Sequence, residues 1–230
     1  MPKIVDHDAR REEIAQALWR VVRRGGIRAA SVRTIAAEAG WSAGAVRYYF
    51  PDQEGLLKFA MELVSRRVGE RLTALTASGG TKGSATVVAL RYLEEVLPLD
   101  EERMVELDVW LAFTAQALAE SGAGALQDNI ESVNDGLHDL CAELVNALSA
   151  AGSLREGLDL RLEAERLHAL VDGLAMHAAV QRRRTTPARV RRLLRLHIDS
   201  LLAEKPLQNK EIGQTKEFSS TARHVRHKPD

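Results

Sequence analysis

Residues 31–50 read SVRTIAAEAGWSAGAVRYYF, which contains two short helical patterns separated by one tight turn. Ser31 and Ser42 are typical N-cap residues, and Gly40 between them allows the chain to reverse within a few residues. The apolar residues of the first pattern keep a helical spacing; they are Val32, Ile35, Ala36 and Ala39. The alanines are small enough to let two helices cross closely. The stretch is therefore predicted to form a helix-turn-helix.

The second of these helices presents an outward face that suits a DNA groove. Val46 and Phe50 are expected to face inward, whereas the small residues after Ser42 let the start of the helix approach a major groove. Arg47 can then pair with guanine or with a phosphate. The predicted DNA-contacting residues of the two helices are Ser31, Arg33, Thr34, Ser42, Ala43, Gly44, Ala45, Arg47, Tyr48 and Tyr49.

Longer helical patterns flank this motif on both sides. The first is expected to begin at Asp8 and to end at Gly25, and a long one is expected to begin at Asp52. A Gly/Ser-rich linker at 77–84 separates this long pattern from those at 85–96, 101–120, 124–150, 160–183 and 187–203. Ala and Leu, both strong helix formers, make up 64 of the 230 residues, whereas aromatic residues make up only 4%. An all-α protein is predicted.

The zero net charge of the chain hides an uneven distribution. Residues 1–60 hold 10 Lys+Arg against 7 Asp+Glu, residues 61–204 hold 16 against 22, and residues 205–230 hold 6 against 3. A basic N-terminal part therefore precedes an acidic body. The balanced total does not argue against a nucleic-acid partner.

Composition also excludes several other classes. The longest stretch without a charged residue, 109–119, is far shorter than the roughly 20 residues that span a bilayer. The N-terminus lacks the apolar segment of a secretory signal, so a cytoplasmic protein with no membrane partner is expected. Cys141 is the only cysteine, which rules out an intrachain disulfide and a cysteine-based zinc site.

The run ARREEIAQALWRVVRRGGIRAASVRTIAAEAGWSAGAVRYYFPDQEGLL, residues 9–57, resembles the N-terminal domain of the TetR family of bacterial transcription regulators. The stretches LPLDEERMVELDVWLAF (97–113) and LHALVDGLAMHAAV (167–180) resemble the C-terminal domain of choline-responsive BetI-type repressors in that family. The resemblance implies a three-helix DNA-binding domain followed by a larger helical domain that binds a small molecule and pairs two subunits. The family often has Lys where this chain has Gln53, which removes one positive charge from the expected DNA face.

The resemblance places a ligand pocket between the long helices of the body. Candidate contacts there are Tyr92, Met104, Trp110, Phe113, Asn134, His138 and Cys141. Asn134, His138 and Cys141 share one helical face. The alternative is that the aromatic residues belong to the core, as aromatic residues at helical spacing usually do.

The last two helical patterns are the dimerisation candidates. Their apolar stripes are Leu167, Leu170, Val171, Leu174 and Ala178 on one helix, and Val190, Leu194, Ile198 and Leu201 on the other. Two such helices from each subunit would form a four-helix bundle. The alternative is that these stripes close the core of a single subunit.

No cofactor or metal is expected. His168 and Asp172 lie one turn apart, but no third ligand has suitable spacing, so a hydrogen-bonded pair is the better interpretation. Three regions are predicted, namely a DNA-binding domain at 1–52, a ligand-binding and dimerisation domain at 53–203, and a disordered polar tail at 204–230.

These patterns together predict a homodimeric, ligand-responsive transcriptional repressor. Its expected partners are a near-palindromic double-stranded DNA operator, a second copy of the chain, and an unidentified small-molecule effector that releases the DNA. A ligand-insensitive DNA-binding regulator or activator is one alternative. A helical small-molecule enzyme is the other, although no spacing in the sequence provides a cluster of titratable groups for catalysis.

Overall fold

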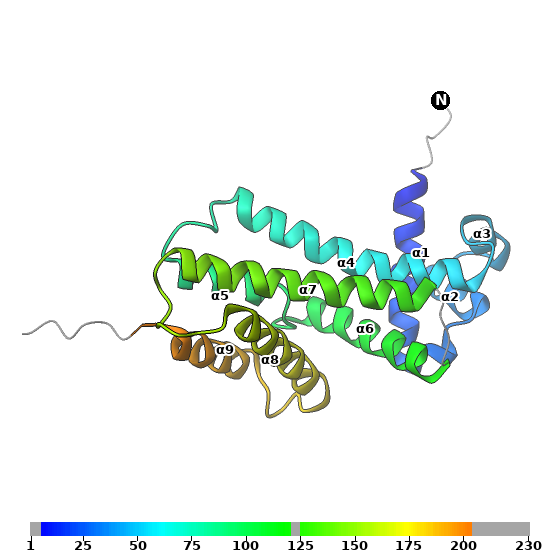
Figure 1. The fold of residues 1–230 in the computed structure, drawn as a ribbon. Helices are drawn as coiled ribbons and strands as arrows, with labels where there is room; N and C mark the ends of the chain where they lie inside the picture. Colours follow the sequence, from blue (N-terminus) through cyan, green and yellow to red (C-terminus); the bar gives the residue numbers. More distant parts are fainter. Residues whose placement is uncertain (1–5, 121–124, 204–230) are drawn as a thin grey trace, which may run out of the picture.

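The computed structural model describes residues 6–120 and 125–203, and Figure 1 shows that helices dominate it. In chain order they are α1 (His7–Gly25), the 3-10 turn η1 (Ile27–Ala29), α2 (Val32–Ala39), α3 (Ala43–Tyr49), α4 (Gln53–Ala77), α5 (Ala85–Glu95), α6 (Glu101–Glu120), α7 (Ala125–Ala150), α8 (Leu160–Val180) and α9 (Pro187–Leu201). Within these residues the only β-type pairing is an isolated bridge between Leu154 and Leu202. The predicted all-α fold is confirmed, whereas the tail at 204–230 lies outside the described residues.

Side-chain caps explain where most of the helices begin. Ser31, Ser42 and Asp52 each accept a hydrogen bond from a backbone N–H in the first turn of the helix that follows, as predicted. The cap of α1 is Asp6, whose Oδ1 accepts from the amides of residues 8 and 9, so the prediction of Asp8 was wrong by two residues. The ends of the helices agree less well with the prediction, since α8 ends at Val180 rather than at residue 183.

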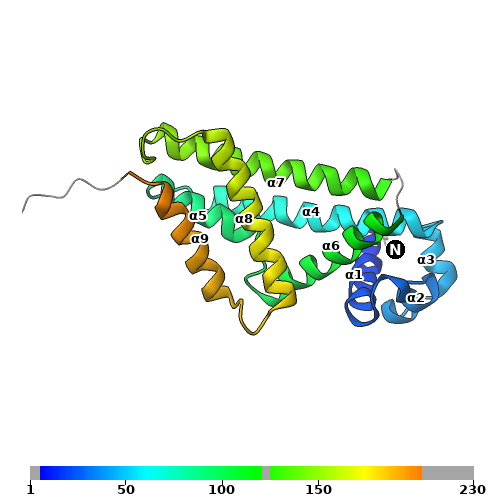
Figure 2. The ribbon, with the colours of Figure 1, turned by 60° about the horizontal axis from the view of Figure 1, so that its bottom comes forward.

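The helices form two regions, which we call the head (residues 6–52) and the body (residues 53–203). In the head, α1, α2 and α3 gather at one end of the molecule, and α4 leaves them to run along the body beside α7 (Figure 1). Seen from below, α8 and α9 lie side by side on one flank, and α6 runs from that region to the head (Figure 2). None of the described helices is long and apolar enough to cross a membrane.

Two apolar cores hold this arrangement together. One contains residues of α5, α7, α8 and α9, and therefore lies within the body. The other contains the buried residues of α1 to α4, and it also takes in Val109, Phe113 and Ala117 of α6 and Ile130 of α7. The body thus supplies part of the core of the head.

Phe113 is the largest residue that α6 contributes to this shared core, and it is fully buried. We expect Phe113→Ala to lower the free energy of unfolding by about 3–5 kcal/mol, because it removes a large apolar side chain and leaves a cavity. Denaturant titration measures this loss. The matched control is Leu118→Ala on the same helix, where the side chain is 73% exposed and the expected loss is below about 0.5 kcal/mol. Equal losses for the two variants would contradict the role assigned to Phe113.

Candidate DNA-binding face and ligand cavity

Local hydrogen bonds fix α2 and the turn that follows it. The Ser31 hydroxyl accepts from the Thr34 amide at 3.2 Å, and the Thr34 hydroxyl accepts from the Ser31 amide at 3.0 Å, which makes a capping box. Gly40 ends α2 in the left-handed conformation (φ 72°), and the Trp41 amide donates back to the Ala36 carbonyl at 2.8 Å. This turn sets the angle at which α3 leaves α2.

The side chains of α3 that were predicted to face inward or outward do so. Val46 and Phe50 are buried, whereas Arg47 and Tyr48 are exposed, with Tyr48 at 71%. The predicted DNA-contacting residues that are exposed are Ser31, Arg33, Thr34, Ser42, Ala43, Gly44, Arg47 and Tyr48; Ala45 and Tyr49 are half-buried. The hydroxyls of the two serines and the threonine also act as caps.

Three residues outside the predicted DNA contacts support this face. The His7 ring lies 5.6 Å from that of Tyr49 and 6.2 Å from that of Tyr48. Trp41 packs edge-on against Tyr49 at 5.6 Å. The Gln53 side-chain amide donates to the Ala30 carbonyl at 2.9 Å, and thereby ties the start of α4 to the residue before the α2 cap. These contacts join residues from different elements of the fold, so no periodic pattern in the sequence could have revealed them.

Ion pairs on α6 connect the head to the rest of the molecule. Arg23 of α1 pairs with Glu101 and lies 3.9 Å from Asp108. The same Asp108 carboxylate accepts from Arg182, just after α8, at 2.6 and 2.8 Å. Asp108 of α6 therefore links Arg23 of the head to Arg182, which follows α8.

A cavity of about 540 Å³ lies in the body between α4, α6, α7 and α8. Its lining is mainly apolar, with a few charged and amide groups, which is typical of a small-molecule site. Among the described residues, the charged members of the lining are Glu62, Arg71, Arg103, Glu106 and Asp172, and Trp110 is the one aromatic member.

Among the predicted ligand contacts, only Trp110 lines this cavity. Phe113 and Cys141 are fully buried in the two cores, and the Tyr92 hydroxyl is within 2.6 Å of that of Thr76. Met104 is half-buried and Asn134 is exposed, and neither lines the cavity. The His138 ring contacts that of His168 on α8 at 6.0 Å.

The register of α7 explains why the predicted positions miss the cavity. The residues that line it include Val133, Leu137 and Leu140, each immediately before a predicted residue. One residue corresponds to about 100° around a helix, so the predicted stripe turns away from the cavity. The sequence correctly grouped Asn134, His138 and Cys141 on one face of α7, but the cavity lies against a neighbouring face of that helix.

Burial controls the chemistry of the Cys141 thiol. Burial, together with the nearby Asp172 carboxylate, raises the pKa of Cys141 from 9.0 to about 12. The reactive thiolate is therefore suppressed at neutral pH. We expect a thiol reagent at mildly alkaline pH to leave Cys141 unmodified in the folded protein and to modify it fully in denaturant. In the variant Ala150→Cys, which adds an exposed thiol to the same helix, the new cysteine should react without denaturant. Equal rates for both cysteines in the folded protein would contradict this assignment.

The predicted dimerisation residues are core residues of one subunit. Leu167, Val171, Leu174 and Ala178 are at most 3% exposed, and so are Val190, Leu194, Ile198 and Leu201; only Leu170 is partly buried. The placement of these residues in a subunit interface must therefore be corrected, because they are buried within a single chain, where most of them belong to the core that α8 and α9 share with α5 and α7. The large apolar side chains that these two helices expose are Leu162, Met176, Val180 and Leu196.

His168 and Asp172 lie close together, with Nε2 3.4 Å from Oδ2, but the predicted hydrogen bond is absent, since His168 Nε2 has no hydrogen-bond partner among the described residues. Partial burial raises the pKa of the Asp172 carboxyl, and the nearby His168 opposes this shift. In the part of the chain that the structure describes, no three His, Cys, Asp or Glu side chains gather as metal ligands would.

Comparison with known proteins agrees with this architecture in both the head and the body. Residues 14–60 match the bacterial regulatory proteins of the tetR family, and residues 88–203 match the C-terminal domain of BetI-type transcriptional repressors. The chain belongs to the TetR family of bacterial transcriptional regulators. The helix-turn-helix at residues 31–50 lies within the first of these matches. Because the members of this family are transcriptional regulators, the protein is not an enzyme.

Individual TetR-family relatives span nearly the same length. The transcriptional regulator PksA of Bacillus subtilis is 39% identical over 204 residues, which cover 89% of this chain and 95% of PksA. BetI of Serratia proteamaculans is 30% identical over 187 residues, which cover 79% of this chain and 86% of BetI. A regulator of Saccharomonospora viridis, solved in complex with choline, superposes with a TM-score of 0.74 over 86% of this chain and all of that one. At 24% identity, that last likeness shows the fold alone.

Proposed function

We propose that the protein is a ligand-responsive repressor that binds near-palindromic operator DNA as a homodimer and releases it when a small molecule occupies the cavity. One observation carries this proposal, namely that a single helix, α4, serves both sites. Its first residue is tied to the head through the bond from Gln53 to Ala30, and its middle turns line the cavity. A molecule in the cavity therefore contacts the helix that supports the DNA-reading face, as two coupled sites require.

The proposed subunit interface is the outer face of α8 and α9. The exposed apolar side chains of this face are Leu162, Met176, Val180 and Leu196. Its charges are complementary, since Glu165 is exposed on α8 whereas Arg189, Arg192 and Arg195 are exposed on α9. No ion pair joins these three arginines to an acidic residue within the described ranges. A two-fold contact that places α8 of one copy beside α9 of the other would bring the opposite charges together.

The effector is proposed to be a small organic molecule with a substantial apolar part. The apolar lining and the cavity volume of about 540 Å³ support this class of ligand. The choline found with the Saccharomonospora viridis neighbour is a further reason to expect a small-molecule effector. We place the protein in the cytoplasm, where a DNA-binding regulator meets its operator.

Selection of DNA from a random pool tests this function. We expect the purified full-length protein to enrich an inverted repeat whose half-sites lie about one DNA turn apart. The selected duplex then serves for a screen of metabolites that release the protein. Enrichment of no sequence, or of a single half-site, would contradict the proposed function. Retention of the duplex across the panel, with increased reporter transcription, would favour the ligand-insensitive activator.

A further inference from the structure

The cavity wall is charged where α4 and α6 meet. Arg71 of α4 and Glu106 of α6 both line the cavity there. Glu106 is only 3% exposed, which is unusual for a carboxylate, and such buried charges are normally paired. Its place in the cavity wall puts this group within reach of any molecule that enters.

Arg71 satisfies Glu106 through a two-point contact. Its Nη1 lies 3.1 Å from Oε1 and its Nη2 lies 2.9 Å from Oε2. Arg67, one turn earlier on α4, lies 3.8 Å from the same carboxylate. A bidentate pair of this kind fixes both the distance and the orientation of the two helices, which a purely apolar contact would allow to slide.

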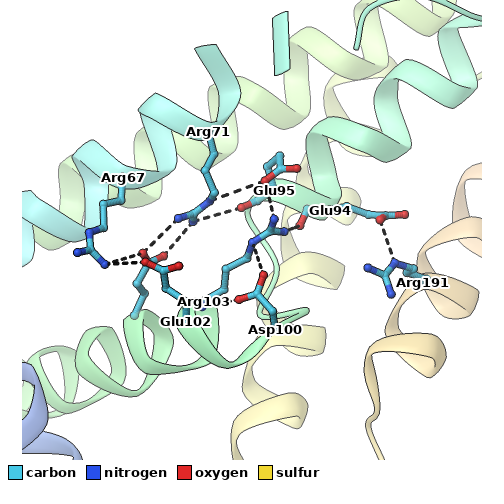
Figure 3. Close-up of polar contacts among 9 residues, drawn as sticks. Arg67, Arg71, Glu94, Glu95, Asp100, Glu102, Arg103 and Arg191 are labelled. Carbon is cyan, nitrogen blue, oxygen red and sulfur yellow. Dashed lines mark hydrogen bonds and ion pairs between the residues drawn. The ribbon is translucent and has the colours of Figure 1, made fainter. Parts of the chain in front are cut away.

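The α5 helix holds the Arg71 guanidinium from another side, as Figure 3 shows. Arg71 Nη2 donates to the Glu95 carbonyl at 3.4 Å, and the Glu95 side chain accepts from Arg103 Nη2 at 2.9 Å. Arg103 in turn donates to the Glu94 carbonyl at 2.7 Å. The Arg71–Glu106 pair therefore belongs to a network that joins α4, α5 and α6 around the polar side of the cavity.

Both helices of the pair are attached to the head. The α4 helix is attached at its start by Gln53, and α6 by the ion pairs of Arg23 with Glu101 and Asp108. The position of α4 relative to α6 therefore decides how the head is held. Arg71 and Glu106 join these two attachments at the cavity.

We propose that Glu106 is a positioning residue for DNA binding, which holds Arg71 so that α4 and α6 keep the head in its DNA-binding arrangement. This inference rests on the proposed function. It names the contact on which a molecule in the cavity acts. The Arg71–Glu106 pair is the point at which the cavity reaches the attachments of the head.

The test requires no effector. Glu106→Gln keeps the shape of the side chain but loses its charge, and we expect the full-length protein to bind the selected duplex roughly tenfold more weakly, within the range typical of coupled sites. Spin labels on Arg33→Cys report the distance between the two heads, and this distribution should shift or broaden in the same variant. The charge-reversed double variant Arg71→Glu/Glu106→Arg should recover most of the affinity.

The matched control is Glu102→Gln on the same helix. Glu102 also pairs with an α4 arginine, with Oε1 3.1 Å from Arg67 Nη1, but its side chain is 74% exposed and does not line the cavity. We expect a change below about twofold, because exposed pairs contribute little. If Glu106→Gln does not fold, Arg71→Lys replaces it; this variant keeps the charge but not the two-point contact, and an intermediate loss of affinity is expected.

Parent-like affinity in the folded Glu106→Gln variant would overturn the inference. A loss of affinity with unchanged distances between the heads would also overturn it, because it would indicate a merely structural role. These results are distinguishable from failure of the proposed function itself. In that case the parent protein enriches no DNA, and both proposals fall together.

Discussion

Arg47→Ala is expected to weaken binding of the proposed homodimer to its selected operator by at least about 30-fold. Arg47 lies on the outward face of α3 and is exposed, while Val46 beside it anchors the helix in the core. One specific arginine contact to a base is worth about 1–3 kcal/mol, and the dimer loses two of them. A gel-shift titration on the selected duplex measures this change, and thermal unfolding should be unaffected.

The matched control for Arg47 is Arg155→Ala, because Arg155 is also an exposed arginine and lies in the loop between α7 and α8. We expect less than about a twofold change there, because surface charges distant from the DNA are largely screened. The repeated selection should also show relaxed base preference at one position of each half-site with Arg47→Ala, but not with the control. Equal titration curves for Arg47→Ala and the parent would refute the role proposed for Arg47.

Leu196→Arg is expected to convert the dimer into a monomer. Leu196 is 57% exposed on α9, so an arginine in its place removes an apolar contact and desolvates a charge at the proposed interface. Loss of the tether between two heads lowers apparent operator affinity by about 10²- to 10⁴-fold. Light scattering with size-exclusion chromatography measures the mass, and the gel shift measures the affinity.

Leu118→Arg provides the control for this second experiment. Leu118 is a leucine with 73% exposure on α6, outside α8 and α9, so its replacement should leave the mass and the operator affinity unchanged. The proposed interface is wrong if Leu196→Arg remains dimeric. It is also wrong if Leu118→Arg separates the subunits equally well.

Most of the helix starts could be predicted because they depend on neighbouring residues. Ser31, Ser42 and Asp52 cap the helices that the sequence places after them, and Gly40 stops α2 as expected. The start of α1 was less certain, because Asp6 and Asp8 are equally good caps and only the backbone decides between them. Local interactions therefore specify the elements almost completely.

The contacts between helices were harder to predict. The stripe containing Leu167, Val171 and Leu174 was correctly recognised as apolar and buried, but periodicity does not reveal which chain covers it. The same limit applies to α7, where a rotation of one residue separates the cavity-lining Leu137 from the predicted His138.

One sequence signal for the cavity could have been used. Glu106 lies three residues before Val109 and seven before Phe113, so a charged residue interrupts the buried stripe of α6. A charge at such a position requires a partner, and Arg71 has a comparable place after Val64 and Val68 on α4. The pairing itself depends on the packing of α4 against α6, which no local pattern specifies.

The apolar core that the head shares with α6 limits how this regulator can be divided or recombined. A fragment that ends at residue 52 lacks Leu56, Ala60, Val109 and Phe113, which cover α1 in the full chain, and would expose the apolar surface of Ile14 and Leu18. A chimera that keeps this DNA specificity therefore has to retain α4 and the inner face of α6. In contrast, the exposed residues of α3 can be changed freely, so new operator preferences are accessible without rebuilding the core.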